Sequence, residues 1–224
     1  MKLKAIVFDL DGTLIDSTIN YEKMSQMVRE LLTKEGVSLD NPNDRRRTYQ
    51  VIQAGEKALV DLGVSPEKIV DLMKRIESVM NSIELEGVNL SKPVKNVHKT
   101  LDEIKNRNLG IGIATRGCHE YAVKSMELTG IYIYIDKMLA RDDVTFPKPD
   151  PRHLLEVVTH LGATPDTVFY VGDSTTDLRT AEAANVPFIG YRRNDEWAKR
   201  LEDAGCKSMV SDLYELVRVV DEKI

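Results

Sequence analysis

The sequence has few cysteines, no long apolar run and no excess of positive charge. Its two cysteines, Cys118 and Cys206, have no paired spacing, which excludes a disulfide scaffold or a zinc knuckle and suits a reducing cytosol. No apolar run approaches the roughly 20 residues that a membrane span requires, and the N-terminal stretch is too short in apolar residues for a secretory signal. With 31 Lys and Arg against 36 Asp and Glu, the net charge is −5, so no global field favours nucleic acid or an anionic membrane. We therefore expect a cytoplasmic protein, a monomer or a homodimer, that binds neither nucleic acid nor membrane.

The pattern of apolar residues divides the 224-residue chain into two kinds of segment. From residue 91 onward, short apolar runs alternate with amphipathic stretches, as in the strand–helix units of a doubly wound parallel α/β sheet. Between about residues 16 and 90, no strand signal interrupts the helical periodicity. We therefore predict an α/β core formed by 1–15 and 91–224, with an inserted all-helical domain at 16–90.

Residues 4–8 form an apolar run that stops at Asp9, as expected for a buried strand. Further strands are predicted at 111–114, 137–140, 168–171 and 186–189, and a final helix from Ser211. Within the insert, Ser65 followed by Pro66 is typical of a helix N-cap and first helical position. Apolar residues then repeat at helical spacing as far as Ile83.

Four polar clusters follow predicted strands. They are Asp9 with Asp11, Thr115, Lys148, and Asp173 with Asp177. Because the carboxyl ends of parallel strands share one edge of a sheet, we expect these residues to meet in one crevice. Hard carboxylate oxygens suit Mg²⁺, which also keeps waters and takes phosphate oxygens. Asp9 and Asp173 supply two such carboxylates, and the sequence therefore predicts a Mg²⁺ site at this edge.

These residue types support phosphoryl transfer, which requires mainly positioning and charge stabilisation. The Asp9 carboxylate can attack phosphorus and form an acyl phosphate. Lys148 would offset the negative charge of the site, and Thr115 with nearby backbone N–H groups would hold phosphate oxygens. If the chain turns at Gly12, the Asp11 side chain can point into the site but away from the metal. There it would protonate the leaving oxygen and later take a proton from water.

The clusters belong to four short strings, which occur in the order DLDGT (Asp9–Thr13), ATRG (Ala114–Gly117), KPDP (Lys148–Pro151) and GDSTTD (Gly172–Asp177). In this order they resemble the four motifs of the haloacid dehalogenase superfamily. The chain is similar to the phosphoglycolate-phosphatase-type members that carry a helical cap. The resemblance covers essentially the whole chain, with strong motifs in the core and weak ones in the insert.

The resemblance implies an enzyme that hydrolyses phosphoric monoester bonds through an aspartyl-phosphate intermediate. Asp9 would be the nucleophile and Asp11 the general acid/base. Mg²⁺ would be bound by the Asp9 side chain, the Asp11 backbone carbonyl and Asp173. The insert would be a cap that closes over the site and excludes water.

The resemblance also implies the groups that hold the substrate, which would be a small phosphorylated metabolite. Thr115, Arg116 and Lys148 would bind its phosphoryl group. Gly12 and Asp177 would be supporting residues, with Asp177 either a metal ligand through water or an anchor behind the ligands.

Each motif taken alone has a simpler explanation. Thr115 could be a helix N-cap, and GDSTTD could be a capped helix start. Their joint occurrence, in order and after strands, favours catalysis. The four histidines show no ligand-like pairing, so surface helix positions are expected for them.

Three functions fit the motifs. The first is hydrolysis of a small phosphomonoester, with phosphoglycolate as the best single substrate. The second is phosphoryl transfer to a sugar, as in the related β-phosphoglucomutases. The third is a non-enzymatic phospho-aspartate receiver. Two features oppose it, since the acceptor follows the first strand and Asp11 is positioned to hasten hydrolysis; a receiver would also need no helical insert.

Overall fold

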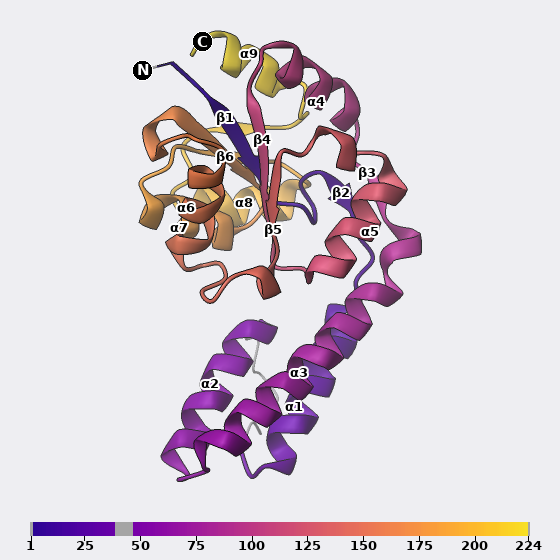
Figure 1. Ribbon diagram of the computed structural model, residues 1–224, viewed down its shortest axis with the longest axis vertical. Coiled ribbons are helices and arrows are strands. Elements are labelled where there is room, and N and C mark those ends of the chain that lie inside the picture. The colour runs from indigo at the N-terminus through magenta and orange to yellow at the C-terminus, as the bar shows by residue number, and fades with distance from the viewer. Residues whose placement is uncertain (1, 39–46, 224) are drawn as a thin grey trace. The chain divides into compact units, whose positions relative to one another are not determined.

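A computed structural model describes residues 2–38 and 47–223 of the chain. The chain forms two compact units (Figure 1). The larger unit comprises Met1–Ser17 and Val88–Ile224, and the smaller unit comprises Thr18–Gly87. In the structure the first junction follows Ser17 and the second follows Gly87, rather than Ile15 and Leu90 as the sequence had predicted.

The observed junctions differ from the predicted ones because the two connecting segments pair with each other inside the larger unit. Strand β2 (Ile15–Asp16) runs antiparallel to β3 (Lys92–Pro93), with Asp16 opposite Lys92. The short 3₁₀ helix η1 (Val88–Leu90) precedes β3 and contacts the larger unit through helix α5 (His119–Thr129). Residues on either side of the insert are therefore held by the larger unit.

The larger unit is built on a six-stranded sheet in the order β5-β4-β1-β6-β7-β8, and every neighbouring pair is parallel. The strands are β1 (Ala5–Phe8), β4 (Gly110–Ala114), β5 (Lys137–Leu139), β6 (Val168–Gly172), β7 (Phe188–Tyr191) and β8 (Met209–Val210). The other helices of this unit are α4 (Val97–Asn106), α6 (Pro151–His160), α7 (Thr175–Ala184), α8 (Asp195–Asp203) and α9 (Glu215–Asp221). Short 3₁₀ turns lie at η2 (Tyr132–Tyr134), η3 (Arg141–Asp143) and η4 (Pro165–Thr167). This is the doubly wound α/β architecture that the alternating pattern predicts.

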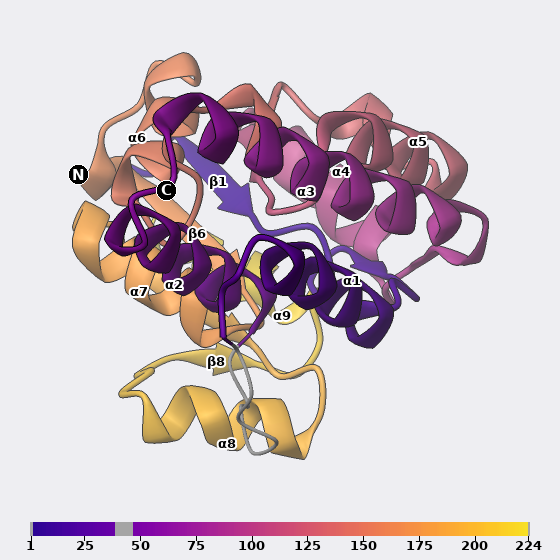
Figure 2. The ribbon, with the colours of Figure 1, turned by 90° about the horizontal axis from the view of Figure 1, so that it is seen from below.

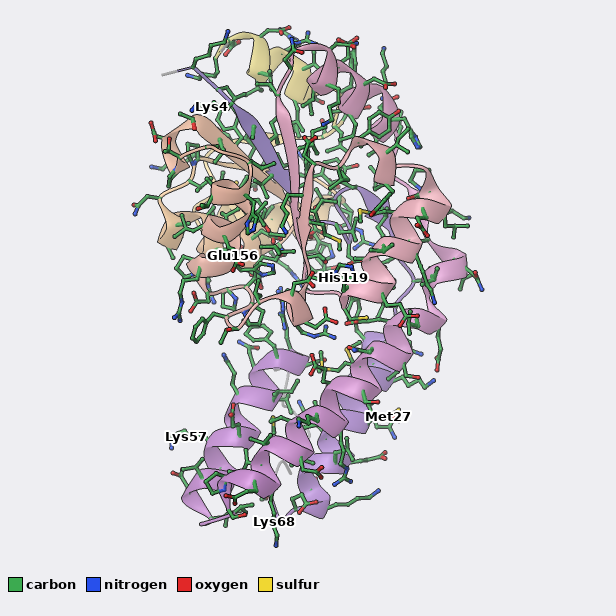
Figure 3. All side chains as sticks on the ribbon, viewed as in Figure 1. Lys4, Met27, Lys57, Lys68, His119 and Glu156 are labelled. Carbon is green, nitrogen blue, oxygen red and sulfur yellow. The ribbon has the colours of Figure 1, made fainter. Side chains whose placement is uncertain are left out.

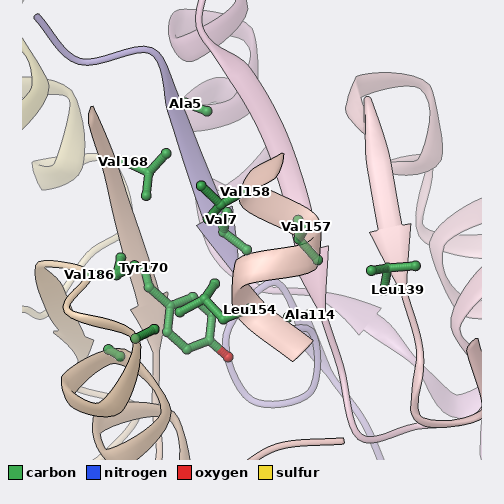
Figure 4. Packing of buried hydrophobic residues seen from close by; sticks show 12 residues of the cluster. Ala5, Val7, Ala114, Leu139, Leu154, Val157, Val158, Val168, Tyr170 and Val186 are labelled. Carbon is green, nitrogen blue, oxygen red and sulfur yellow. The ribbon is translucent and has the colours of Figure 1, made fainter. Parts of the chain in front are cut away.

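One face of the sheet is covered by α6 and α7. Because side chains alternate along a strand, Ala5 and Val7 of β1 point to the same face as Val168 and Tyr170 of β6 (Figure 4). These strand residues belong to one buried cluster with residues of α6 that include Leu154, Val157 and Val158. Burial on both sides explains why β1 reads as a continuous apolar run rather than an alternating one.

The order of the strands places the carboxyl end of β1 where the connections change direction. The chain passes from β1 to β4 and β5 on one side, then returns to β6 on the other side of β1. Phe8 pairs with both Ile113 of β4 and Val171 of β6. The residues that follow these three strands therefore emerge side by side at a topological switch point, where α/β sheets bind ligands.

The smaller unit consists of three helices, α1 (Tyr21–Lys34), α2 (Thr48–Asp61) and α3 (Pro66–Glu86). Their buried faces carry apolar residues at helical spacing, such as Met24, Val28 and Leu32 on α1. Gly55 permits the contact between α1 and α2, because a Cβ atom there would lie 2.6 Å from the Leu32 methyls. Charged side chains such as Lys57 point away from these helices (Figure 3).

The C-terminal part of the chain differs most from the sequence-based expectation. Helix α8 and strand β8 were not expected, and both lie at one margin of the larger unit (Figure 2). Helix α8 buries only Ala198 and Leu201, so its apolar signal is weak. The strand expected at 186–189 begins only at Phe188, directly after Pro187, and the final helix begins at Glu215 rather than Ser211. Within the residues that the structure describes, no helix has the length and apolar character to cross a membrane.

Candidate active site

Three carboxylates converge beyond the ends of β1 and β6. Asp9 follows β1, Asp173 follows β6, and Asp177 lies in the first turn of α7. One oxygen from each lies within 4.8 Å of the others. The three residues are only 8%, 4% and 1% exposed, respectively. Packing three carboxylates this closely without water is unfavourable unless positive charge accompanies them.

Lys148 brings part of that charge. Its Nζ donates to Asp9 Oδ1, to Asp177 Oδ1 and to the hydroxyl of Tyr170, each at 2.7 Å. An ammonium group has three N–H donors, so these contacts engage all of them. We call Asp9, Asp173, Asp177 and Lys148 the Asp9 cluster.

Charge within the Asp9 cluster is unevenly balanced. Burial opposes charge on Asp177, but the Lys148 ammonium outweighs it and holds the pKa of Asp177 below its ordinary value. Burial likewise opposes charge on Lys148, but Asp177 and Asp9 raise its pKa overall. By contrast, burial together with the charge of Asp177 raises the pKa of Asp9 to about 7. Burial and the charge of Asp9 raise the pKa of Asp173 well above its ordinary value.

These pKa shifts indicate that the Asp9 cluster has too little positive charge for its carboxylates. Lys148 and Asp177 compensate each other, while Asp9 and Asp173 share too little positive charge to ionise readily. Buried carboxylate oxygens at this spacing are the donor set that a small divalent cation such as Mg²⁺ prefers. The residues present therefore fit a Mg²⁺ ion held by Asp9 and Asp173.

Asp11 lies in a tight turn and faces away from this donor set. Gly12 adopts a φ of +82°, which residues other than glycine rarely adopt. Its N–H donates to Ile15 O at 2.7 Å. A Cβ atom at Gly12 would also lie 2.3 Å from Asp173 Oδ2. The turn directs the half-buried Asp11 side chain to Tyr121 of α5, whose hydroxyl donates to Asp11 Oδ1 at 2.5 Å.

Thr115 and Arg116 follow β4 at the same edge of the sheet. Thr115 is fully buried, its N–H donates to Leu139 O, and its Oγ1 accepts from the N–H of Gly117 at 3.1 Å. The hydroxyl hydrogen of Thr115 is not used by that contact, because Oγ1 acts there as an acceptor. The Arg116 backbone oxygen accepts from Arg141 Nη1 at 2.5 Å.

Asp177 is fixed from several sides. It is the third residue of α7, and its Oδ2 accepts from the N–H and the hydroxyl of the N-cap residue Ser174. Its Oδ1 accepts from Lys148 and from the hydroxyl of Tyr170. Gly172 leaves room for this side chain, because a Cβ atom there would lie 2.6 Å from Asp177 Cβ. Asp177 thus orients Lys148, in keeping with a supporting role.

Two residues that support Lys148 were not identified from the sequence. Tyr170 accepts from Lys148 and donates to Asp177, which completes a closed triangle of hydrogen bonds. His153 of α6 is completely buried; its Nδ1 accepts from the N–H of Lys148 at 3.2 Å, and its Nε2 lies 3.0 Å from Leu139 O. The expectation of surface positions is therefore wrong for His153. Strand alternation from Val168 could have indicated Tyr170, and the i, i+4 spacing to Val157 could have indicated His153.

Arg193, which follows β7, was also missed. Its Nη2 lies 3.2 Å from Asp16 Oδ1 and its Nη1 lies 3.9 Å from Asp173 Oδ2. The side chain is 35% exposed, so it lies at the rim of the cluster rather than inside it. No regular spacing in the sequence links Arg193 to the four motifs.

Comparison with known proteins identifies a family for the chain. The profile of the haloacid dehalogenase-like hydrolases matches residues 6–191. A pyrophosphatase, PpaX, of Oceanobacillus iheyensis is 26% identical over 99% of this chain and 99% of its own length. A phosphoglycolate phosphatase of Salmonella typhi is 27% identical over 84% of this chain and 81% of its own length.

Solved structures show the same fold. A hydrolase from Pseudomonas syringae superposes with a TM-score of 0.66 at 22% identity, covering 98% of each chain. At this identity the likeness concerns the fold alone, and it extends over both the α/β unit and the helical insert.

Proposed function

Since the chain belongs to the haloacid dehalogenase-like hydrolases, we propose that it is a Mg²⁺-dependent phosphatase that cleaves a small phosphomonoester through an aspartyl-phosphate at Asp9. The observation that carries this proposal is the surroundings of the Asp9 carboxylate. One oxygen is held by Lys148 at 2.7 Å, and Asp173 lies alongside. The group is thus fixed beside a cation and a second carboxylate, at the switch point of the sheet.

In the first step, a carboxylate oxygen of Asp9 attacks phosphorus. The new O–P bond forms as the bond from phosphorus to the leaving oxygen breaks, and the Asp11 carboxyl gives its proton to that oxygen. Asp11 suits this role because the turn at Gly12 separates its side chain from the Asp9 cluster. The products of this step are an alcohol and the acyl phosphate on Asp9.

In the second step, water attacks the phosphorus of the acyl phosphate. The Asp11 carboxylate takes the proton from this water, and the O–P bond to Asp9 breaks. Inorganic phosphate leaves and the Asp9 carboxylate is regenerated. Lys148, and the hydroxyl of Thr115 with backbone N–H groups after β4, would stabilise the charge on the phosphoryl oxygens in both steps. Arg116 would add a further cation beside them.

Mg²⁺ would be held by the Asp9 and Asp173 carboxylates and the Asp11 backbone carbonyl. When bound, it supplies the positive charge that the phosphoryl oxygens and the carboxylates need. Burial and neighbouring carboxylates raise the pKa values of Asp9 and Asp173, and a cation held between them would favour their charged forms.

The substrate proposed is a small phosphorylated metabolite, with phosphoglycolate as the best single candidate. The support is the relative of that name, whereas another relative is named a pyrophosphatase. We further propose a cytoplasmic monomer or homodimer that binds neither nucleic acid nor membrane; its two cysteines are unpaired. Light scattering of the purified protein would give the oligomeric state.

The test is a broad panel of phosphorylated metabolites, including phosphoglycolate and pyrophosphate, with and without Mg²⁺. We expect steady, metal-dependent release of inorganic phosphate and a hydroxylamine-labile phosphate on Asp9 in acid-quenched samples. Asp9→Asn keeps the shape of the side chain but should lower kcat by at least about 10³-fold. Asp203→Asn, on the exposed part of α8, is the matched control and should behave as wild type.

Three outcomes would redirect the proposal. Full turnover by Asp9→Asn would remove Asp9 as the nucleophile. Interconversion of phosphosugar isomers without release of phosphate would indicate phosphoryl transfer. A stable phosphoenzyme with no turnover of any phosphomonoester would indicate a receiver.

A further inference from the structure

Several hydroxyl groups lie near Tyr121, whose own hydroxyl contacts Asp11. Ser91 Oγ donates to Ser125 Oγ at 3.3 Å. The side chains of Ser17 and Ser125 lie close enough to the Tyr121 hydroxyl to partly offset the effects that raise its pKa. Tyr121 in turn donates to Asp11 Oδ1 at 2.5 Å.

The hydrogen bond to Asp11 fixes where the Tyr121 proton lies. Because an ionised carboxylate oxygen can only accept, the hydroxyl hydrogen of Tyr121 points to Asp11 Oδ1. Burial, followed by the charge of Asp11, also raises the pKa of the Tyr121 hydroxyl, which therefore remains a donor.

Packing holds Tyr121 in this orientation. The side chain is completely buried on α5. Gly117, in the turn after β4, leaves room for the ring, because a Cβ atom there would lie 2.8 Å from Tyr121 Cδ1. A phenylalanine would fill the same space, so packing alone does not require the hydroxyl.

We propose that Tyr121 is a positioning residue for general-acid catalysis, whose hydroxyl occupies Oδ1 of Asp11 so that Oδ2 carries the transferable proton. In the first step this proton moves from Asp11 Oδ2 to the leaving oxygen as the P–O bond breaks and the Asp9–phosphorus bond forms. Tyr121 keeps its own proton throughout. The inference rests on the proposed function, since it assigns a role within that reaction.

Two of these serines lie in the segments that flank the insert. Ser17 directly follows β2, and Ser91 directly precedes β3. The paired segments β2 and β3 therefore bring hydroxyl groups to the surroundings of Tyr121.

The test compares two substrates of Tyr121→Phe. One is p-nitrophenyl phosphate, whose leaving group departs as a stable anion and needs no proton. The other is the best aliphatic phosphate ester found in the metabolite panel, whose alkoxide must be protonated. We expect kcat/KM to fall about 10- to 100-fold for the aliphatic ester and less than about threefold for the aryl ester.

Two further variants make the comparison decisive. Tyr132→Phe, at an exposed tyrosine of η2, is the matched control and should leave both values unchanged. Ser125→Ala keeps the bond between Tyr121 and Asp11 but removes a hydroxyl behind it. We expect a smaller loss with the same selectivity for the aliphatic ester.

Equal losses on both substrates, or no loss on either, would overturn the proposal, because a tyrosine that only packs the core cannot distinguish leaving groups. If Tyr121→Phe fails to fold, the same criterion applies to Ser125→Ala. If the wild type hydrolyses neither ester, the proposed function fails first, and this outcome is distinct from the others.

Discussion

Lys148 donates to Asp9 Oδ1 at 2.7 Å although the two residues are 139 positions apart in the sequence. The side chain of Lys148 is 2% exposed and that of Asp9 is 11% exposed, so the ion pair is almost dry. Because Lys148 also donates to Asp177 and Tyr170, all three of its N–H donors are engaged. A phosphoryl oxygen that bound Lys148 would therefore have to share or replace one of these acceptors, and in the proposed reaction Asp9 is the one that bonds to phosphorus.

Replacing Lys148 by methionine tests this relationship. The variant keeps the length of the side chain but leaves Asp9 and Asp177 buried without their cation. We expect kcat/KM to fall about 10²- to 10³-fold, as for loss of one group that stabilises transition-state charge. The free energy of unfolding should fall by about 3–5 kcal/mol, because one partner of a buried ion pair is removed. Steady-state kinetics and urea unfolding give both values.

The matched control is Lys57→Met on α2. Lys57 also pairs with an aspartate, Asp61, but its side chain is 77% exposed (Figure 3). This variant should leave kcat/KM and the unfolding free energy unchanged. Wild-type kinetics for Lys148→Met would contradict the assignment of Lys148 to the phosphoryl group.

Asp173→Asn should have opposite effects in the absence and presence of Mg²⁺. Without the metal, the variant removes a carboxyl whose pKa is raised by burial and by the charge of Asp9, so it should melt at a higher temperature than wild type. With Mg²⁺ at about 100 times its Kd, wild type should gain about 2.7 kcal/mol of stability. The variant should require at least about 10-fold more Mg²⁺ for the same gain.

Thermal unfolding across a Mg²⁺ titration measures both effects of Asp173→Asn. Asp203→Asn on α8 changes the same charge at a side chain that is 65% exposed and should follow the wild-type curve. If Asp173→Asn and wild type were stabilised equally by Mg²⁺, Asp173 would not be a ligand.

The parts of the fold that follow simple rules could be predicted from the sequence. Strand β1 ends at Phe8, directly before Asp9, because an apolar run of buried residues is followed by a carboxylate, and β6 ends at Gly172 before Asp173 in the same way. Parallel strands place their carboxyl ends together, so the sequence alone indicates that the residues of the Asp9 cluster meet at one edge of the sheet. The helices of the insert could be predicted equally well, because their apolar residues repeat at helical spacing.

The residues that support the Asp9 cluster could not be predicted in this way. Tyr170 lies within an apolar strand, where its ring packs in the core and only its hydroxyl reaches Lys148. His153 is buried because that face of α6 packs on the sheet; its i, i+4 spacing to Val157 indicates the buried face but not the hydrogen bond to Lys148. Tyr121 reaches Asp11 from 110 positions away through the packing of α5. Such contacts depend on the tertiary packing of helices on the sheet, which periodicity does not specify.

The buried His153 makes stability depend on pH. Burial, together with the nearby Lys148 charge, lowers the pKa of His153 to about 4, whereas Leu139 O and Asp143 favour its charged form and Arg116 opposes it. An unfolded histidine has a pKa of about 6.5. Between these values the unfolded chain binds the proton and the folded chain does not, so folding loses stability as the pH falls. The full effect is about 3 kcal/mol, from about 1.4 kcal/mol for each pKa unit.

His153→Asn isolates this effect. Its side-chain oxygen can accept from the N–H of Lys148 near the position of Nδ1, but it does not titrate. Urea unfolding should show that the stability difference between wild type and variant changes, to the disadvantage of wild type, by up to about 3 kcal/mol from about pH 7 to about pH 4. His160→Gln removes a histidine from the exposed side of the same helix and serves as the control. A difference between wild type and His153→Asn that stays constant across this range would show that His153 is not held neutral in the folded protein.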